Sequence, residues 1–175
     1  MDEATSLSFT IRTVQIQDVS FLWDMLYEAA AVAEVMRALG KEKALSLPVN
    51  RKYVEGWGRP GDAGVIAVDQ MDQPLGAAWY RLHPDEAPGY GFVSPMMPEL
   101  TIGVRADVRG QGLGHALLQT LLALAQSQGY AALSLSVDRN NPALHLYERC
   151  GFRDAGRSDQ EETSVTMIKQ WSERD

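Results

Sequence analysis

The chain is poor in cysteine and has no long apolar run. Cys150 is the one cysteine among 175 residues. A single cysteine cannot form an internal disulfide, and this usage fits a reducing compartment. No apolar stretch approaches the length that spans a bilayer, and Met1–Glu3 is acidic where a secretory signal would be basic. The sequence therefore predicts a cytoplasmic protein without a membrane segment.

Positive charge is also scarce. The chain has 16 Lys and Arg residues against 23 Asp and Glu residues, a formal net charge of −7 at pH 7. This balance argues against nucleic-acid binding. An anionic ligand must then be held by local N–H groups and single cations, while a cationic amine is slightly favoured by the overall field. The length fits one domain, and the 45% of hydrophobic residues is ordinary for a globular protein.

The hydrophobic periodicity predicts a mixed α/β fold. Helices are expected at 18–29 with Asp18 as N-cap, at 33–45 with Gly40 as a weak point, and at 48–56, 113–128 and 142–149. Strands are expected at 8–14, 65–68, 75–82, 100–104, 131–137, from 152 onward, and at 165–168. Between them, residues 83–98 form a loop with four prolines and two glycines, long enough to suggest a functional loop or lid. This order predicts a mixed sheet with helices on both faces.

A glycine-rich turn stands between a strand and the strongest helix. Residues 99–114 read ELTIGVRADVRGQGLG, and a leucine-rich helical pattern follows at once. Such a turn aims several backbone N–H groups in one direction, and the helix dipole adds partial positive charge. The combination favours phosphate or pyrophosphate. A Cβ at Gly112 or Gly114 would hold a ligand off the backbone or block a positive-φ turn, and Arg109 adds a positive charge at the mouth.

The common nucleotide motifs do not fit this turn. The dinucleotide fingerprint has different glycine spacing, and the P-loop needs a Lys-Ser/Thr ending where this chain has His115. Instead, Arg109, Gly112 and Gly114 match the acyl-CoA loop of the GNAT superfamily of N-acetyltransferases. The stretch 140–152, NNPALHLYERCGF, resembles the segment that follows this loop in the same family. Two motifs in the right order and spacing are far more specific than either alone, and the resemblance covers roughly residues 60–155.

The resemblance implies a fold and a co-substrate. A GNAT-like fold is a mostly antiparallel sheet of about seven strands, splayed at the CoA site, in a single domain over 1–175. Its CoA-binding half would be about 98–155 and its acceptor side about 8–97. Acetyl-CoA would be the co-substrate, without a metal. The residues that would contact it are the strand backbone of Ile102, Gly103 and Val104, the turn residues Arg109, Gly110, Gln111, Gly112, Leu113 and Gly114, and Asn140 or Asn141, one of which could instead cap the following helix.

Two residues are candidates for acid–base chemistry. Strand alternation places Glu99 with Thr101 and Gly103, opposite Leu100 and the other apolar residues. A carboxylate there could take a proton from an amine, and the resemblance implies a general base at this place; the alternative is a solvated Glu at a strand end. The resemblance likewise places the Tyr147 phenol near the CoA sulfur as an acid. Its alternative is a half-buried aromatic that anchors the helix.

Other reactive residues point to ordinary roles. Cys150 lacks an evident His and carboxylate partner, so packing is favoured. His83, His115 and His145 lack metal-ligand spacing and are interpreted as solvated or local polar residues. An aromatic group could line an acceptor pocket or belong to the core: Trp57, Trp79, Tyr80, Tyr90 and Phe92.

These observations favour an enzyme that acetylates a primary amine by direct attack in a ternary complex. The acceptor, a small molecule or a peptide, is open among a small amine, an amino acid, an aminoglycoside-like compound and a protein N-terminus. The alternative is a non-catalytic acyl-CoA-binding or sensor module, which would need neither Glu99 nor Tyr147. A nucleotide-binding domain is a weaker third possibility. Whether the chain forms a homodimer is left open.

Overall fold

A seven-stranded sheet carries the fold, in the order β1-β2-β3-β4-β5-β7-β6. The computed structural model describes residues 6–158 and 162–172, so the acidic Met1–Glu3 lies outside it. All neighbouring strands are antiparallel except β4 and β5. The strands are β1 (Thr10–Thr13), β2 (Ala63–Val68), β3 (Pro74–Arg81), β4 (Glu99–Val104), β5 (Ala132–Asp138), β6 (Arg153–Ser158) and β7 (Ser164–Gln170).

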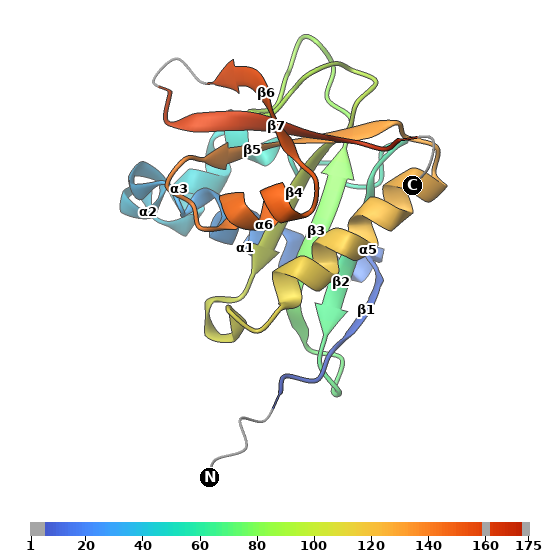
Figure 1. Cartoon of the computed structure of the whole chain (residues 1–175). Helices are drawn as coiled ribbons and strands as arrows, with labels where there is room; N and C mark the ends of the chain where they lie inside the picture. The colour runs from blue at the N-terminus through green and yellow to red at the C-terminus, as the bar shows by residue number, and fades with distance from the viewer. Residues whose placement is uncertain (1–5, 159–161, 173–175) are drawn as a thin grey trace.

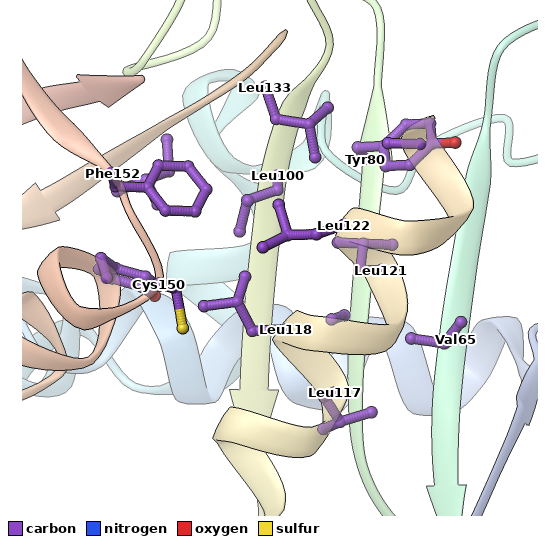
Figure 2. Close-up of a cluster of buried hydrophobic side chains, with 14 of the residues drawn as sticks. Val65, Tyr80, Leu100, Leu117, Leu118, Leu121, Leu122, Leu133, Cys150 and Phe152 are labelled. Atoms are coloured by element: carbon purple, nitrogen blue, oxygen red, sulfur yellow. The ribbon is translucent and has the colours of Figure 1, made fainter. Parts of the chain in front are cut away.

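Helices cover both faces of this sheet, as the sequence predicts (Figure 1). The helices are α1 (Val19–Ala30), α2 (Glu34–Leu39), α3 (Lys41–Ser46), α4 (Pro48–Arg51), α5 (Leu113–Ser127) and α6 (Ala143–Arg149). The leucine stripe of α5 packs on one face, with Leu117, Leu118 and Leu121 fully buried (Figure 2). On the other face, Leu22 and Met25 of α1 pack against buried residues of β2 and β3. Burial of two apolar faces gives the sheet a core on each side.

The sheet divides between β4 and β5. These parallel strands pair at one position, Glu99 with Ser134, whereas β3 and β4 stay in register from Gly76 with Val104 to Arg81 with Glu99. Beyond Glu99 the two strands separate, and the β5–β7–β6 part turns away from β1–β4 (Figure 1). The splayed, mostly antiparallel sheet that the resemblance implied is confirmed.

A close helix approach explains the glycine in the middle of β4. A Cβ on Gly103 would lie 2.5 Å from the carbonyl oxygen of Met25, in α1. The register of β4 with β3 runs through Gly103 without a shift. The glycine therefore does not mark a bulge in β4 but permits close approach of the backbone of α1.

The helical segments before β2 differ from the prediction. Gly40, with φ of 79°, divides the helix expected at 33–45 into α2 and α3, and α4 ends at Arg51 instead of reaching residue 56. Asp18 stands at the N-cap of α1 but makes no capping hydrogen bond. Its carboxylate accepts instead from Arg12, at 2.7 Å, and from the backbone N–H of Gln15. The Arg12 guanidinium and the free N–H groups of α1 compete for the Asp18 carboxylate. The guanidinium prevails because charge-assisted hydrogen bonds are stronger.

Among the residues that the structure describes, no helix combines the length and the apolar character that crossing a membrane would need.

Replacement of Gly103 by Ala should destabilise the protein. The new methyl group would press on the backbone of α1, and overpacking of this kind costs about 1–3 kcal/mol. Gly114→Ala is the matched control, because its Cβ would meet Leu146 at 3.6 Å, an ordinary contact. Urea unfolding of both variants measures the difference. A Gly103→Ala protein as stable as Gly114→Ala would show that α1 can shift away at little cost.

Candidate active site

A cleft of about 880 Å³ lies where β4 and β5 separate. Its walls come from both strands, from the glycine turn and the start of α5, and from α6. The end of α1, α2 and the region of Tyr53 and Tyr90 close its other side. On the β5 side of the cleft, the peptide groups of β4 beyond Glu99 have no strand partner, because the ladder holds only the pair Glu99 and Ser134. Ile102, Gly103 and Val104 all line this opening.

The glycine turn forms one end of the cleft. Gly110 and Gly112 have positive φ values of 75° and 85°, and α5 begins at Leu113. Leu113 and Val108 are buried in the hydrophobic core that contains the leucine stripe of α5, which we call the α5 core. Both sides of the turn are therefore anchored by packing. The first N–H groups of a helix lack intrahelical acceptors. The turn therefore has the geometry of an anion site, with Gly112 needed for its left-handed backbone. Gly114 has ordinary helical conformation, and a Cβ there would cause no clash.

Arg109 lies at the mouth of the cleft but has a partner in this structure. Its Nη2 donates to Oε2 of Glu28 on α1 at 2.5 Å, and its Nε donates to the carbonyl of Val104. The guanidinium is about half exposed. Sequence reasoning did not identify Glu28, which is 81 residues away from Arg109 in the chain.

The two asparagines before α6 occupy different places. Asn141 lines the cleft, and its Oδ1 accepts from the backbone N–H of Ala143, the first residue of α6. Asn140 is exposed and does not line the cleft, and its backbone N–H donates to the carboxylate of Asp138. The structure thus gives Asn141 the hydrogen bond of a helix cap and a place in the cleft lining, whereas Asn140 lies outside the cleft.

Tyr147 lines the cleft from α6 and is 6% exposed. Its ring packs edge-on against Phe152, with ring centroids 5.9 Å apart. Burial raises the pKa of the phenol above its usual value, so the hydroxyl keeps its proton at neutral pH. A group of this kind suits a hydrogen-bond donor to a developing thiolate.

Glu99 is buried in the wall of the cleft, not solvated at a strand end. Tyr53 donates its hydroxyl to Oε1 at 2.7 Å, and the backbone N–H of Gly91 donates to the same oxygen at 2.8 Å. The hydroxyl of Tyr53 in turn accepts from the N–H of Tyr90. Burial is the largest effect on the carboxyl group and raises its pKa from 4.5 to about 7, against the opposing hydrogen bonds and the charge of Lys52. A carboxyl group with this pKa can accept a proton near neutral pH.

The 83–98 loop encloses this carboxyl group. A Cβ on Gly89 would lie 2.0 Å from Oε2 of Glu99, and one on Gly91 would lie 2.4 Å from the backbone of Leu135 in β5. Only glycine permits such close backbone approach at both points. Lys52 secures the loop from outside by donating to the carbonyl of Pro88. The 83–98 loop, whose length suggested a functional role, is therefore packed on Glu99.

Of the two interpretations given to the histidines, solvated or local polar residues, the solvated one is wrong for His83. It is 3% exposed and packs edge-on to Tyr53, with ring centroids 5.2 Å apart. Its Nε2 is 3.8 Å from Oε2 of Glu99. His145 is exposed, as expected. Neither His83 nor Tyr53 stands in a spacing that a pattern could detect, because each comes from a separate segment.

The remaining candidates have mostly structural roles. Cys150 packs in the α5 core beside Leu118 (Figure 2), and burial raises the pKa of its thiol. Of the five aromatic residues considered for an acceptor pocket, Tyr90 alone lines the cleft. Trp79 is buried and donates its indole N–H to the carbonyl of Tyr53. Among the described residues, no group of three His, Cys, Asp or Glu side chains could hold a metal ion.

Comparison with known proteins matches residues 23–152 to the family model described as the acetyltransferase (GNAT) family. The L-methionine sulfoximine/L-methionine sulfone acetyltransferase of Pseudomonas paraeruginosa is 32% identical over 124 residues, 70% of this chain and 69% of that protein. The mycothiol acetyltransferase of an Arthrobacter species is 33% identical over 102 residues. Those residues make up 58% of this chain but 30% of the mycothiol enzyme.

Solved structures share the fold. The PaiA N-acetyltransferase of Thermoplasma acidophilum, in complex with coenzyme A, superposes with a TM-score of 0.64 at 17% identity, covering 94% of this chain and 100% of the other. The ribosomal-protein-alanine N-acetyltransferase of Brucella melitensis gives a TM-score of 0.65 at 22% identity, with 93% and 99% covered. Likeness at such identities shows the fold alone.

Proposed function

The chain belongs to the acetyltransferase (GNAT) family, and from this premise we propose that it transfers an acetyl group from acetyl-CoA to the primary amine of a small molecule. The observation that carries the proposal is the cleft between β4 and β5, with the buried carboxyl group of Glu99 in its wall. The relatives named for methionine sulfoximine and mycothiol acetylation support a small-molecule acceptor. Their acceptors differ, so the identity of the amine is not carried over.

Acetyl-CoA would lie along the splayed edge. The peptide groups of Ile102, Gly103 and Val104 have no β5 partner and could pair with the amides of the pantetheine arm. The start of α5 and the turn at Gly112 would receive the pyrophosphate. Arg109 would add a charge-assisted contact after leaving Glu28. Asn141, which lines the cleft at the start of α6, would contact the pantetheine arm.

Glu99 would act as the general base. An alkylammonium group has a pKa of about 10.4 and must lose a proton before it can attack. The ionised carboxyl group would take that proton, directly or through one water molecule. The amine nitrogen then bonds to the thioester carbonyl carbon, the carbon–sulfur bond breaks, and the thiolate leaves. Tyr147 would donate a hydrogen bond or a proton to that sulfur. The second proton lost by the nitrogen would end on the sulfur or restore the phenol, so the products are the amide and the free thiol. A module that only binds acyl-CoA would need no buried carboxyl group with a pKa near 7.

Gly112→Glu should abolish binding of acetyl-CoA. The side chain would fill the turn and repel the pyrophosphate, and position 112 has a φ of 85°. Gly129→Glu is the matched control, because it adds the same charge at a φ of 84° at the opposite end of α5. Calorimetric titration with acetyl-CoA compares the two folded variants. Equal affinity in both would refute the assignment of the turn.

Tyr147→Phe should lower kcat by roughly 10²-fold, typical of a positioned acid or base, with little change in acetyl-CoA affinity. The hydroxyl alone is lost, and the ring still packs on Phe152. Tyr130→Phe, which removes a phenol outside the cleft lining, serves as the control. Free-thiol release in the presence of a good acceptor measures the rates. An unchanged kcat would leave Tyr147 with a packing role.

Glu99→Gln should remove the acidic limb of the kcat/KM profile, which we expect near pH 7 in the wild type. The base is active when ionised, so the wild-type rate rises as the pH passes the pKa. The mutant should be slower by about 10²-fold at pH 7 and should recover at pH 10, where more of the amine is neutral. Equal deficits at pH 7 and pH 10 would make Glu99 an orienting residue. Wild-type rates throughout would direct the search to Asp85 or Glu86.

A further inference from the structure

Two buried polar atoms face each other behind the cleft without hydrogen-bond partners. They are Nε2 of His83 and Oε2 of Glu99, separated by 3.8 Å. Both residues are 3% exposed, and His83 does not line the cleft. Unpartnered polar atoms cost free energy when buried, so a facing pair of them calls for an explanation.

The two carboxylate oxygens of Glu99 have different surroundings. Oε1 receives two donors, the hydroxyl of Tyr53 and the N–H of Gly91. Oε2 is bounded by the backbone of Gly89 and by the His83 ring. The edge-on contact with Tyr53 fixes that ring in place. Nε2 of His83 therefore stands opposite Oε2, at 3.8 Å, on the side away from the two donors to Oε1.

We propose that His83 is a positioning residue for Glu99, which donates its Nε2–H to Oε2 of the ionised carboxylate. The two atoms need to approach by less than about 1 Å to form a normal hydrogen bond. The bond would fix the orientation of the carboxylate and favour its ionised form. The inference rests on the proposed role of Glu99 as the base.

The charges around the pair keep His83 neutral at working pH. Burial lowers the pKa of the ring to about 4, followed by the positive charges of Arg81, Arg59 and Lys52, with Asp62 opposing them. Lys52 also faces Glu99, together with the hydroxyl of Tyr53, whose own pKa is raised by burial. A neutral imidazole remains a donor from about pH 5 upward, so the titration near pH 7 belongs to Glu99.

A titration of the Glu99 carboxyl carbon by ¹³C NMR tests the inference without any assay of activity. The protein is labelled at its Glu carboxyl carbons, and Glu99→Gln identifies the Glu99 signal. His83→Phe keeps a ring against Tyr53 but removes the donor, so the Glu99 midpoint should rise by about one pH unit. His83→Gln restores an N–H donor and should recover most of the shift. His145→Gln, at an exposed position of α6, is the control and should leave the midpoint unchanged.

Activity gives a second readout. In His83→Phe the acidic limb of kcat/KM should move upward with the NMR midpoint, while the affinity for acetyl-CoA stays the same. An unmoved Glu99 midpoint in His83→Phe, or a shift that His83→Gln fails to reverse, would overturn the inference. If His83→Phe does not fold, His83→Leu and His83→Gln give the same comparison. Failure of the proposed function looks different: the midpoint moves with His83, yet Glu99→Gln acetylates amines at the wild-type rate.

Discussion

The separation of β4 from β5 is the constraint on which the site depends. The two parallel strands pair at Glu99 and Ser134 and then diverge, so the peptide groups of β4 face a cleft and not a neighbouring strand. Buried backbone groups need partners, which makes an open strand edge costly unless a ligand or water can supply them. The two strands diverge while α5 packs on one face of the sheet and α1 packs on the other. The opening is thus built into the fold.

Close backbone approaches at three glycines enclose the site. Gly103 lets α1 lie on β4, Gly89 lets the 83–98 loop press on the carboxyl group of Glu99, and Gly91 seats the same loop on β5. A side chain at any of them would push a wall of the cleft outward. This packing removes Glu99 from solvent, and the loop then replaces water with fixed donors, the N–H of Gly91 among them. The lack of a side chain at these three glycines therefore closes the site as much as the surrounding side chains do.

Features set by local chemistry could be predicted from the sequence, and features set by distant packing could not. The turn at Gly112 and the stripe of α5 follow from residues adjacent in the chain, and strand alternation gave the face of Glu99. Alternation says nothing about what covers that face. Tyr53 is 46 residues away from Glu99, and the loop reaches it by folding back. The same limit applies to Asp18, which was expected to cap α1. Its carboxylate binds Arg12 of β1 instead, a partner that the local sequence pattern does not reveal.

A carboxylate that acts as a general base must meet two opposing requirements, and the surroundings of Glu99 address both. A solvated carboxylate has a pKa near 4.5 and takes a proton from an ammonium group reluctantly, whereas a buried carboxylate without donors stays protonated and cannot act at all. Burial supplies basicity, while Tyr53 and Gly91 supply hydrogen bonds that keep the charged form accessible. Both donors act on Oε1, so the ionised form still leaves Oε2 to be stabilised. The imidazole of His83 faces that oxygen from outside the cleft lining, so its removal should change the balance without changing the cleft itself.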